Sequence, residues 1–277
     1  MTDRLKEMII CIPTYKRKWP SILACIRLNQ DLDFTMFVRK DDYEAGYYDE
    51  PQFKLDNLNF VVIDGVHELG MTREKMLQYA INKGYKYCMQ IDDSQFGLQD
   101  ITGQYVRLSE IINECLLRFE TDKHKDKAFV MNFIRNVENV ESFQQYFLSQ
   151  LCQTFILNCE VCKQYDLHFY NLDECGLEDL SFVIHAADKG LIELSDARFI
   201  RIGRPGSVVG EKGGCHEEDD KNKYLQLNIK RAKDIERYVM NCNDIKDKQF
   251  LLVKQSILYP GTTYCKFNCD YARRKLL

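Results

Sequence analysis

Apolar side chains form short continuous runs along the chain, and these runs alternate with segments of helical spacing. Residues 8–12 are an apolar run that ends at Pro13, residues 19–28 carry apolar side chains three and four positions apart, and residues 34–38 form a second run. Short runs bounded by turn residues predict buried strands, and the wider spacing predicts an amphipathic helix. The chain therefore opens with the order strand, helix, strand.

The same alternation continues over the next fifty residues. Residues 59–63 predict a third strand, a helix is expected from Thr72 as its N-cap to Gly84 at its C-cap, and an apolar segment just before Asp92 predicts a fourth strand. Strands that alternate with helices predict a mostly parallel sheet with both faces covered, in which ligands bind beyond the carboxyl ends of the strands. Asp92 and Asp93 lie at such an end.

Beyond residue 100 the order is looser. Further helices are predicted near residues 107–119, 177–187 and 221–240, and further strands at residues 128–134, 154–157 and 198–203. The fold class we expect is α/β, a Rossmann-like mixed sheet flanked by helices, with a helical C-terminal extension. We expect a core of residues 1–216 and an extension of residues 217–277 that packs on it.

The chain has 277 residues, of which 45% are hydrophobic. A chain of this length and composition can bury one large core, which argues against an intrinsically disordered protein. Its formal net charge of −4 excludes a surface coated in positive charge but not a local basic face. No apolar run approaches the roughly 18 residues that a membrane-spanning helix needs. We therefore expect a cytoplasmic protein with no membrane partner, and the sequence leaves its oligomeric state open.

Twelve cysteines could indicate a disulfide framework, but a chain of this size needs none. Cys11, Cys25 and Cys88 lie in apolar segments, so we expect reduced, buried thiols. A different interpretation is a four-cysteine zinc site that would stabilise a nucleic-acid-binding module. Its ligands would be the two closely spaced pairs Cys159 and Cys162, and Cys265 and Cys269.

The adjacent carboxylates of Asp92 and Asp93 are the main candidate for chemistry. Two negative charges at the end of a core strand cost folding energy unless a positive group lies beside them. An acidic turn or a helix cap would account for them without a function. A divalent cation would account for them as well, because carboxylate oxygens suit Mg²⁺ or Mn²⁺, and such an ion bridges a diphosphate. The second interpretation implies a nucleotide-diphosphate substrate.

Four motifs occur in an order that resembles GT-A type nucleotide-sugar glycosyltransferases. They are IICIPTYKR (residues 9–17), GMTREKMLQYAINKGYKYCMQIDDS (70–94), LEDLSFVIHAADKG (177–190) and GGCHEED (213–219). The resemblance covers about residues 8–216 and implies a GT-A type fold and transfer of a sugar from a nucleotide-diphosphate donor, such as a UDP-sugar, to a hydroxyl group. A looser resemblance to the TET-associated glycosyltransferases of phages implies a hydroxymethylated base in double-stranded DNA, such as hydroxymethylcytosine, as the acceptor, and a host cytoplasm as the location.

The resemblance also implies roles for single residues. The residues expected to bind the donor are Pro13, Thr14, Tyr15, Arg17, Arg73, Asp92 and Asp93. Among them, Arg73 would reach the diphosphate, because its planar fork of donors suits phosphate oxygens. Asp93 and His216 would hold Mn²⁺ or Mg²⁺. Ser94 stands where the family motif has its second aspartate, so the metal site departs from the pattern.

Asp179, with Glu178 beside it, is the expected catalytic pair. By the resemblance, Asp179 would act as the general base that deprotonates the acceptor hydroxyl, which makes the transfer inverting. Two acids at the start of a helix are also favoured by the helix dipole alone, without any catalytic role. The residues by themselves leave both interpretations open.

The C-terminal part carries a candidate nucleic-acid face. Residues 221–237 hold six basic and two acidic side chains, and the chain ends in YARRKLL. The acidic segment HEEDD precedes this stripe, so charge pairing within the protein explains the pattern equally well. A polysaccharide, a protein or a small molecule are the alternative acceptors. A nucleotidyltransferase would need a glycine-rich loop after the first strand, and IPTYKR has none.

Overall fold

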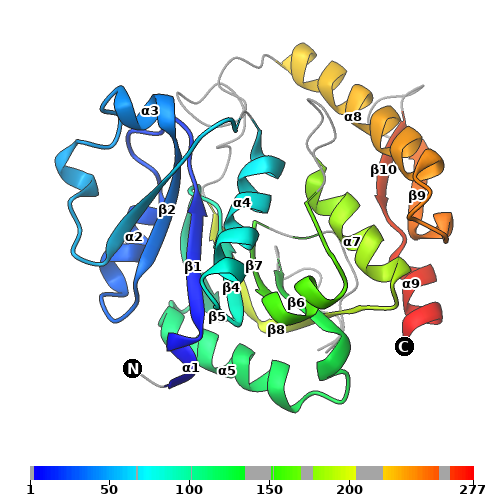
Figure 1. Ribbon diagram of the computed structural model, residues 1–277, viewed down its shortest axis with the longest axis horizontal. Coiled ribbons are helices and arrows are strands. Elements are labelled where there is room, and N and C mark those ends of the chain that lie inside the picture. Colours follow the sequence, from blue (N-terminus) through cyan, green and yellow to red (C-terminus); the bar gives the residue numbers. More distant parts are fainter. Residues whose placement is uncertain are drawn as a thin grey trace.

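The computed structural model describes residues 3–66, 68–100, 102–134, 151, 153–169, 177–203, 221–255 and 263–277. In this part of the chain, eight strands form one mixed sheet with the order β3-β2-β1-β4-β7-β6-β8-β5, and helices cover both of its faces (Figure 1). The strands are β1 (Met8–Pro13), β2 (Phe34–Arg39), β3 (Leu58–Ile63), β4 (Tyr87–Ile91), β5 (Gln95–Asp100), β6 (Ala128–Ile134), β7 (Thr154–Asn158) and β8 (Ile192–Gly203). The expected α/β mixed sheet flanked by helices is confirmed.

The first half of the sheet is parallel. Strand β1 pairs in parallel with β2 and with β4, and β2 pairs in parallel with β3. Strand β7 then runs antiparallel to β4 and β6, while β8 is parallel to β6 and antiparallel to β5. The carboxyl ends of β1, β2 and β4 therefore meet at one edge, as the sequence predicts for a ligand site.

Each strand of the sheet centre has two buried faces. The helices are α1 (Asp3–Lys6), α2 (Ile22–Leu28), α3 (Lys40–Glu44), α4 (Leu69–Asn82), α5 (Leu108–Thr121), α6 (Cys159–Gln164), α7 (Glu178–Asp188), α8 (Lys221–Asn241) and α9 (Cys269–Leu276). Because side chains alternate along β1, Ile9 and Cys11 pack with α4, α6 and α7, while Ile10 and Ile12 pack with α2 and α5. This double burial explains why β1 is a continuous apolar run.

The C-terminal extension consists of α8, an antiparallel hairpin and α9. The hairpin pairs β9 (Leu251–Gln255) with β10 (Thr263–Phe267), so the extension, which was expected to be helical, also contains a two-stranded sheet. The hairpin escaped prediction because it is short and exposes Lys254 and Lys266 within its strands. Ile235 of α8 and Phe267 of β10 belong to the same apolar cluster as α7, so the extension is packed onto the sheet domain.

Some element boundaries differ from those expected. Helix α4 begins at Leu69 with Glu68 at its N-cap, and Thr72 lies inside the helix, where its hydroxyl donates to the carbonyl of Glu68 at 3.1 Å. Gly84 follows the helix with a φ of +78°, which confirms its place at the helix end. Strand β5 was not predicted. None of the described helices is long and apolar enough to cross a membrane.

Candidate functional site

Asp93 lies at the carboxyl edge of the parallel strands, next to the end of β1. Its Oδ2 accepts a hydrogen bond of 2.8 Å from the hydroxyl of Thr14 and lies 3.4 Å from Nε of Arg17. Asp93 is 8% exposed. The loop after β1 therefore supplies both a hydrogen bond and a positive charge to this carboxylate, and the structure brings together three of the expected donor-binding residues.

Asp92 contacts a different arginine. Nη2 of Arg73, on α4, lies 3.1 Å from Oδ1 of Asp92, and Nε of Arg73 lies 3.1 Å from Oε1 of Glu178. Arg73 is 3% exposed, and its guanidinium carbon lies 5.1 Å from the centre of the Phe155 ring. One buried cation thus joins the end of β4 to the first turn of α7, and each of the two adjacent aspartates has an arginine beside it.

The two acids at the start of α7 differ in their surroundings. Glu178 is buried at 6% exposure and paired with Arg73. Asp179 is partly exposed, and its Oδ1 accepts the backbone N–H of Leu180 at 2.9 Å. Leu177, just before the helix, has a φ of +88°, a conformation that costs energy for a residue other than glycine. The chain therefore turns sharply at this point, and Asp179 is the more accessible of the two carboxylates.

Tyr15 lies at the other side of the β1 loop. The guanidinium carbon of Arg39, at the end of β2, lies 4.1 Å from the centre of the Tyr15 ring, and Nζ of Lys16 lies 5.1 Å from it. A hydrogen bond with Tyr15 raises the pKa of Lys16. Tyr15 is half-buried, so its expected contact with a nucleotide base or ribose stays a prediction.

Asp42 is a polar residue of this edge that the sequence reasoning missed. It is 3% exposed, and its Oδ2 has no hydrogen-bond partner among the described residues. Burial raises the pKa of its carboxyl group, against the opposing charges of Lys16 and Arg39. The signal was present in the sequence, because Asp42 follows β2 and parallel strands end at one edge.

The loop between β1 and α2 is held from several sides. The backbone N–H of Ile22 donates to the carbonyl of Asp93 at 3.1 Å, and the side chain of Gln52 donates to the carbonyl of Lys18 at 2.8 Å. Trp19, the only tryptophan of the chain, is nevertheless 69% exposed on this loop. The loop therefore fixes Arg17 near Asp93 and presents an indole to solvent close to the site.

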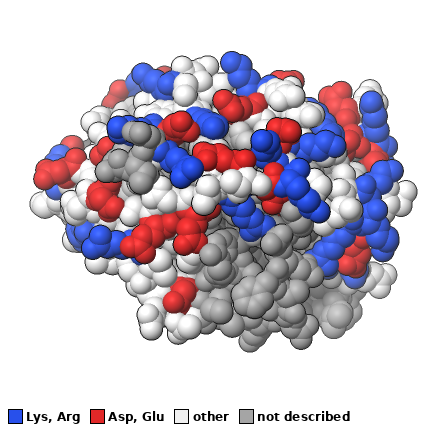
Figure 2. Space-filling model, turned by 90° about the horizontal axis from the view of Figure 1, so that it is seen from below, with Lys and Arg blue, Asp and Glu red and all other residues white. Residues whose placement is uncertain are grey.

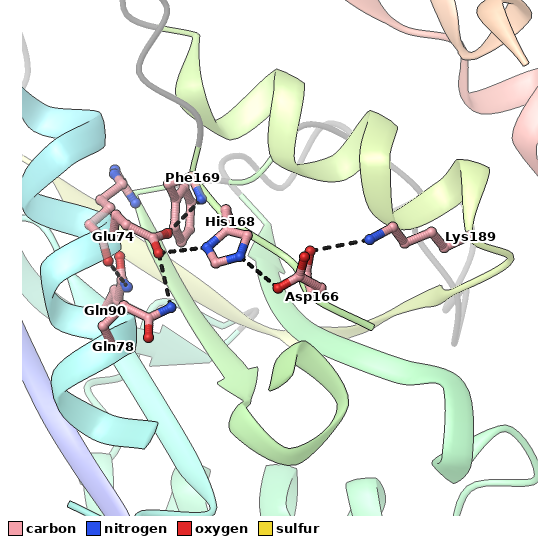
Figure 3. A network of polar contacts seen from close by, with 8 residues as sticks. Glu74, Gln78, Gln90, Asp166, His168, Phe169 and Lys189 are labelled. Carbon is pink, nitrogen blue, oxygen red and sulfur yellow. Dashed lines mark hydrogen bonds and ion pairs between the residues drawn. The ribbon is translucent and has the colours of Figure 1, made fainter. Parts of the chain in front are cut away.

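A polar network beside Arg73 fixes the position of α4 (Figure 3). The Glu74 carboxylate contacts Nδ1 of His168 at 2.8 Å and accepts the backbone N–H of Phe169 at 2.8 Å, and Nε2 of His168 lies 2.9 Å from Asp166. Burial by itself would lower the pKa of His168, but the hydrogen bonds with Glu74 and Asp166 outweigh it, and its pKa is raised. Phe169 stacks on Phe182 of α7 at 4.1 Å. The network therefore links α4 to α7, the two helices that provide Arg73 and Glu178.

The described residues do not by themselves make a metal site. They contain no group of three or more His, Cys, Asp and Glu side chains placed to hold an ion. Arg17 and Arg73 lie where a cation would lie to balance Asp93 and Asp92. Ser94 is buried at 8% exposure, and the expected ligand His216 lies outside the described residues.

The four-cysteine zinc site is not present. Cys159 and Cys162 are buried in α6, whereas Cys265 lies on β10 and Cys269 at the start of α9, and the four do not gather in one group. Burial raises the pKa of the Cys265 thiol to about 11, which disfavours the thiolate that zinc binds. The expectation that Cys11, Cys25 and Cys88 are buried and unpaired is confirmed.

Comparison with known proteins gives structural likeness only. No protein-family model matches the chain, and no curated protein matches it in sequence. Its solved neighbours include a protein provisionally named a nucleotide-diphospho-sugar transferase from Desulfovibrio desulfuricans G20, with 11% identity and a TM-score of 0.42 over 69% of this chain and 82% of that one. Another is GalNAc-T7, solved with UDP, GalNAc and Mn²⁺, with 9% identity and a TM-score of 0.48 over 87% of this chain and 52% of that one.

A third neighbour is a protein provisionally named a glucose-1-phosphate thymidylyltransferase from Bacillus anthracis, solved with sucrose. It has 7% identity and a TM-score of 0.41 over 81% of this chain and 95% of that one. The chain spans about half the length of the GalNAc-T7 structure. The neighbours are thus named for nucleotide-sugar chemistry, but scores and identities this low do not establish a common activity.

Proposed function

We propose that the chain is a glycosyltransferase that moves a sugar from a nucleotide-diphosphate donor, with UDP-sugars the first to test, to a hydroxyl acceptor. The observation that supports this proposal is the convergence of motifs that lie far apart in the sequence. Thr14 and Arg17 contact Asp93, and Arg73 joins Asp92 to Glu178, at the edge where parallel strands end. Isolated acidic turns and helix caps would not need to meet in this way.

The side chains suggest how the donor is held. Pro13 ends β1, and Thr14 and Tyr15 follow it on the side where a base and ribose would lie, with Arg39 stacked on Tyr15. Arg17 is the expected partner of the diphosphate at the Asp93 side. Arg73 is expected to reach the diphosphate while it keeps its contacts with Asp92 and Glu178. If its guanidinium moved away from them, two buried carboxylates would be left without a compensating cation.

The transfer itself is a single displacement. The acceptor oxygen attacks the anomeric carbon, the bond from that carbon to the phosphate oxygen breaks, and the nucleoside diphosphate leaves with the electron pair. Asp179 takes the proton of the acceptor hydroxyl, and the single displacement inverts the configuration of the anomeric carbon. Glu178 acts through Arg73 and positions the first turn of α7.

A divalent ion such as Mn²⁺ or Mg²⁺ would offset the charge of the departing diphosphate. Of the expected ligands, Asp93 lies at the site but is already bound to Thr14 and Arg17, and the described residues do not complete a coordination sphere. The steps above therefore use side chains of the chain alone.

For the acceptor, we propose a hydroxymethylated base in double-stranded DNA. The loose resemblance to the phage enzymes supports it, and so does the positive charge of the C-terminal residues. A polysaccharide, a protein or a small molecule are the other acceptors to test. A base inside a duplex would have to be extruded to reach Asp179.

Thermal unfolding with nucleotides tests the donor proposal. UDP and UDP-sugars should raise the melting temperature, since a ligand that binds only the folded state stabilises it by mass action. Trp19 should report the same event through its fluorescence, because it is the only tryptophan and lies on the loop that carries Arg17. Release of UDP would then be measured with hydroxymethylcytosine DNA and with unmodified DNA. If UDP, GDP and dTDP all fail to shift the melting temperature, the proposal is wrong.

A further inference from the structure

The charge of the chain is divided unevenly between its two parts. Residues 221–277 contain 13 Lys and Arg and 5 Asp and Glu, which gives a formal charge of +8. The four acids of residues 217–220, at the start of the extension, reduce its charge to +4, and since the whole chain has a net charge of −4, residues 1–216 carry −8. Figure 2 shows Lys and Arg gathered on the side of the molecule where Figure 1 draws α8, β9, β10 and α9. One side of the protein therefore attracts polyanions while the rest repels them.

Helix α8 places its basic residues outward. Ala232, Ile235 and Val239 are buried against the sheet domain. Lys233 and Arg237, four positions apart, are exposed on the other side of the helix. Among the described side chains of α8, the exposed side consists of polar and charged groups together with Met240, which is 49% exposed.

The hairpin adds a second set of cations with an aromatic ring between them. Lys254 is directly opposite Tyr264 in the antiparallel register, and Lys266 lies two positions further on the same face of β10. Lys254 and Lys266 are exposed, and Tyr264 is 40% exposed. The inner face packs on α8, where the Cys265 thiol donates to the carbonyl of Ala232 at 3.2 Å. The outer face of the hairpin therefore carries two lysines and a tyrosine, with the half-buried Leu252 opposite Lys266.

Acidic neighbours compensate only part of this charge. Asp234 pairs with Arg237 at 3.0 Å, and Asp247 lies 3.9 Å from Nζ of Lys275. Within the described residues, Lys233, Lys254 and Lys266 have no carboxylate within ion-pair distance. These three lysines lie on different elements, with Lys233 on the exposed side of α8 and Lys254 and Lys266 on the hairpin face opposite the one that packs on α8, and they make up the basic surface of the extension.

We propose that this surface, defined by Lys233, Lys254, Lys266 and Tyr264, binds duplex nucleic acid through its phosphates. Regularly spaced phosphates suit cations spread over a helix and a hairpin, and binding is strengthened by counterion release. An anionic membrane is the weaker match, because α8 turns Ala232, Ile235 and Val239 inward and, among its described side chains, exposes Met240 as the one large apolar group. A role of this surface in docking the acceptor depends on the proposed function. Binding of a duplex by the surface does not depend on it.

Fluorescence anisotropy with a labelled, unmodified duplex of about 30 base pairs tests this inference on the full chain. The variant Lys233→Glu/Lys254→Glu/Lys266→Glu should bind at least about tenfold more weakly, and the slope of log K against log salt should decrease in magnitude by up to about 3. The matched control is Lys54→Glu/Lys83→Glu/Lys125→Glu, which makes the same change in net charge at exposed lysines of the sheet domain. It should keep its affinity within about twofold and most of its salt slope.

Three outcomes would overturn the inference. The first is an equal loss of affinity in both triple variants, and the second is no binding of the duplex by the unmodified chain at low salt. The third is that the unmodified chain binds phosphatidylserine vesicles in place of DNA and that the first triple variant loses this vesicle binding. The UDP-induced rise in melting temperature is measured on both variants to show that they fold. The same measurement separates the two proposals. Donor binding without duplex binding would refute only the proposal of a basic surface, and duplex binding without donor binding would refute only the proposal of a glycosyltransferase.

Discussion

Nε of Arg73, in the middle of α4, lies 3.1 Å from Oε1 of Glu178 in the first turn of α7, while Nη2 of the same side chain lies 3.1 Å from Asp92. The three residues come from separate segments of the chain and are held in a largely buried position. Negative charge in such a position costs free energy unless a cation compensates it, so the guanidinium between the two carboxylates should stabilise the fold.

Replacing Arg73 by Ala should destabilise the protein strongly. The change leaves Asp92 and Glu178 without their buried cation, and breaking such a pair costs about 3–5 kcal/mol. Urea unfolding followed by circular dichroism measures the free energy of unfolding. Lys75→Ala, at an exposed position of the same helix, is the control and should change it by less than about 0.5 kcal/mol. A loss of similar size in both variants would mean that the ion pairs do not stabilise the fold.

Asp93→Ala should weaken UDP binding and remove any enhancement by Mn²⁺. The carboxylate orders Thr14 and Arg17 at the expected donor site, and it is the expected metal ligand. Thermal shift titrations with UDP, in the presence of Mn²⁺ and of EDTA, measure both effects. Asp93→Asn serves as the partner variant, because it can keep the hydrogen bond to Thr14 while it loses the charge. If EDTA leaves the unmodified chain's UDP affinity unchanged, the cation has no part in donor binding.

The two acids of α7 should separate into a catalytic and a positioning residue. Asp179→Asn should keep UDP binding and lose transfer, by about 100-fold or more, because the acceptor proton has no base. Glu178→Gln should lower the free energy of unfolding as well as activity, because it removes the charge paired with Arg73. Initial rates of UDP release and urea unfolding are measured on both variants. Full transfer by Asp179→Asn would remove the general-base assignment.

His185 should make the protein less stable in mild acid. Burial, with a further contribution from Lys189, lowers the pKa of this histidine to about 4, below its usual value of 6.5. The neutral ring contacts the Tyr238 hydroxyl at 2.9 Å, which joins α7 to α8. Its contribution is fully present above about pH 6.5 and is lost as the pH falls toward 4, by up to about 3 kcal/mol.

The difference in unfolding free energy between pH values of about 7.5 and about 4.5 measures this effect. His185→Gln can keep a hydrogen bond to Tyr238 and does not titrate, so its pH dependence should be shallower than that of the unmodified chain. The nearby charged residues Asp188, Asp244 and Lys248 are the same in both proteins, so their contributions cancel in the comparison. Parallel pH profiles would show that His185 is not the sensitive group.

Local pattern was sufficient for most of the sheet. The apolar runs predicted β1, β2, β3 and β4, because strands that are buried on both faces, such as β1 and β4, are rich in apolar side chains, and the edge strand β3 keeps such a run although Asn59 and Val62 are exposed. The same pattern predicted that Asp92 and Asp93 follow β4. Because β4 is the parallel neighbour of β1, the aspartates lie near Thr14 at the end of β1. The hairpin β9–β10 and strand β5 were missed, because short strands with exposed polar residues have no distinct period.

The sequence by itself determined the α/β class, the position of the acidic pair at a strand end and the excess of positive charge in the last fifth of the chain, because each depends on neighbours along the chain. Only the tertiary structure decided that Arg17 pairs with Asp93, that Arg73 is shared by Asp92 and Glu178, and that Glu74 and His168 brace α4. Such pairs join segments separated by many residues, and several carboxylates were available to each arginine. Packing of the helices on the sheet selected among them, since it set which charges are buried together and must compensate each other.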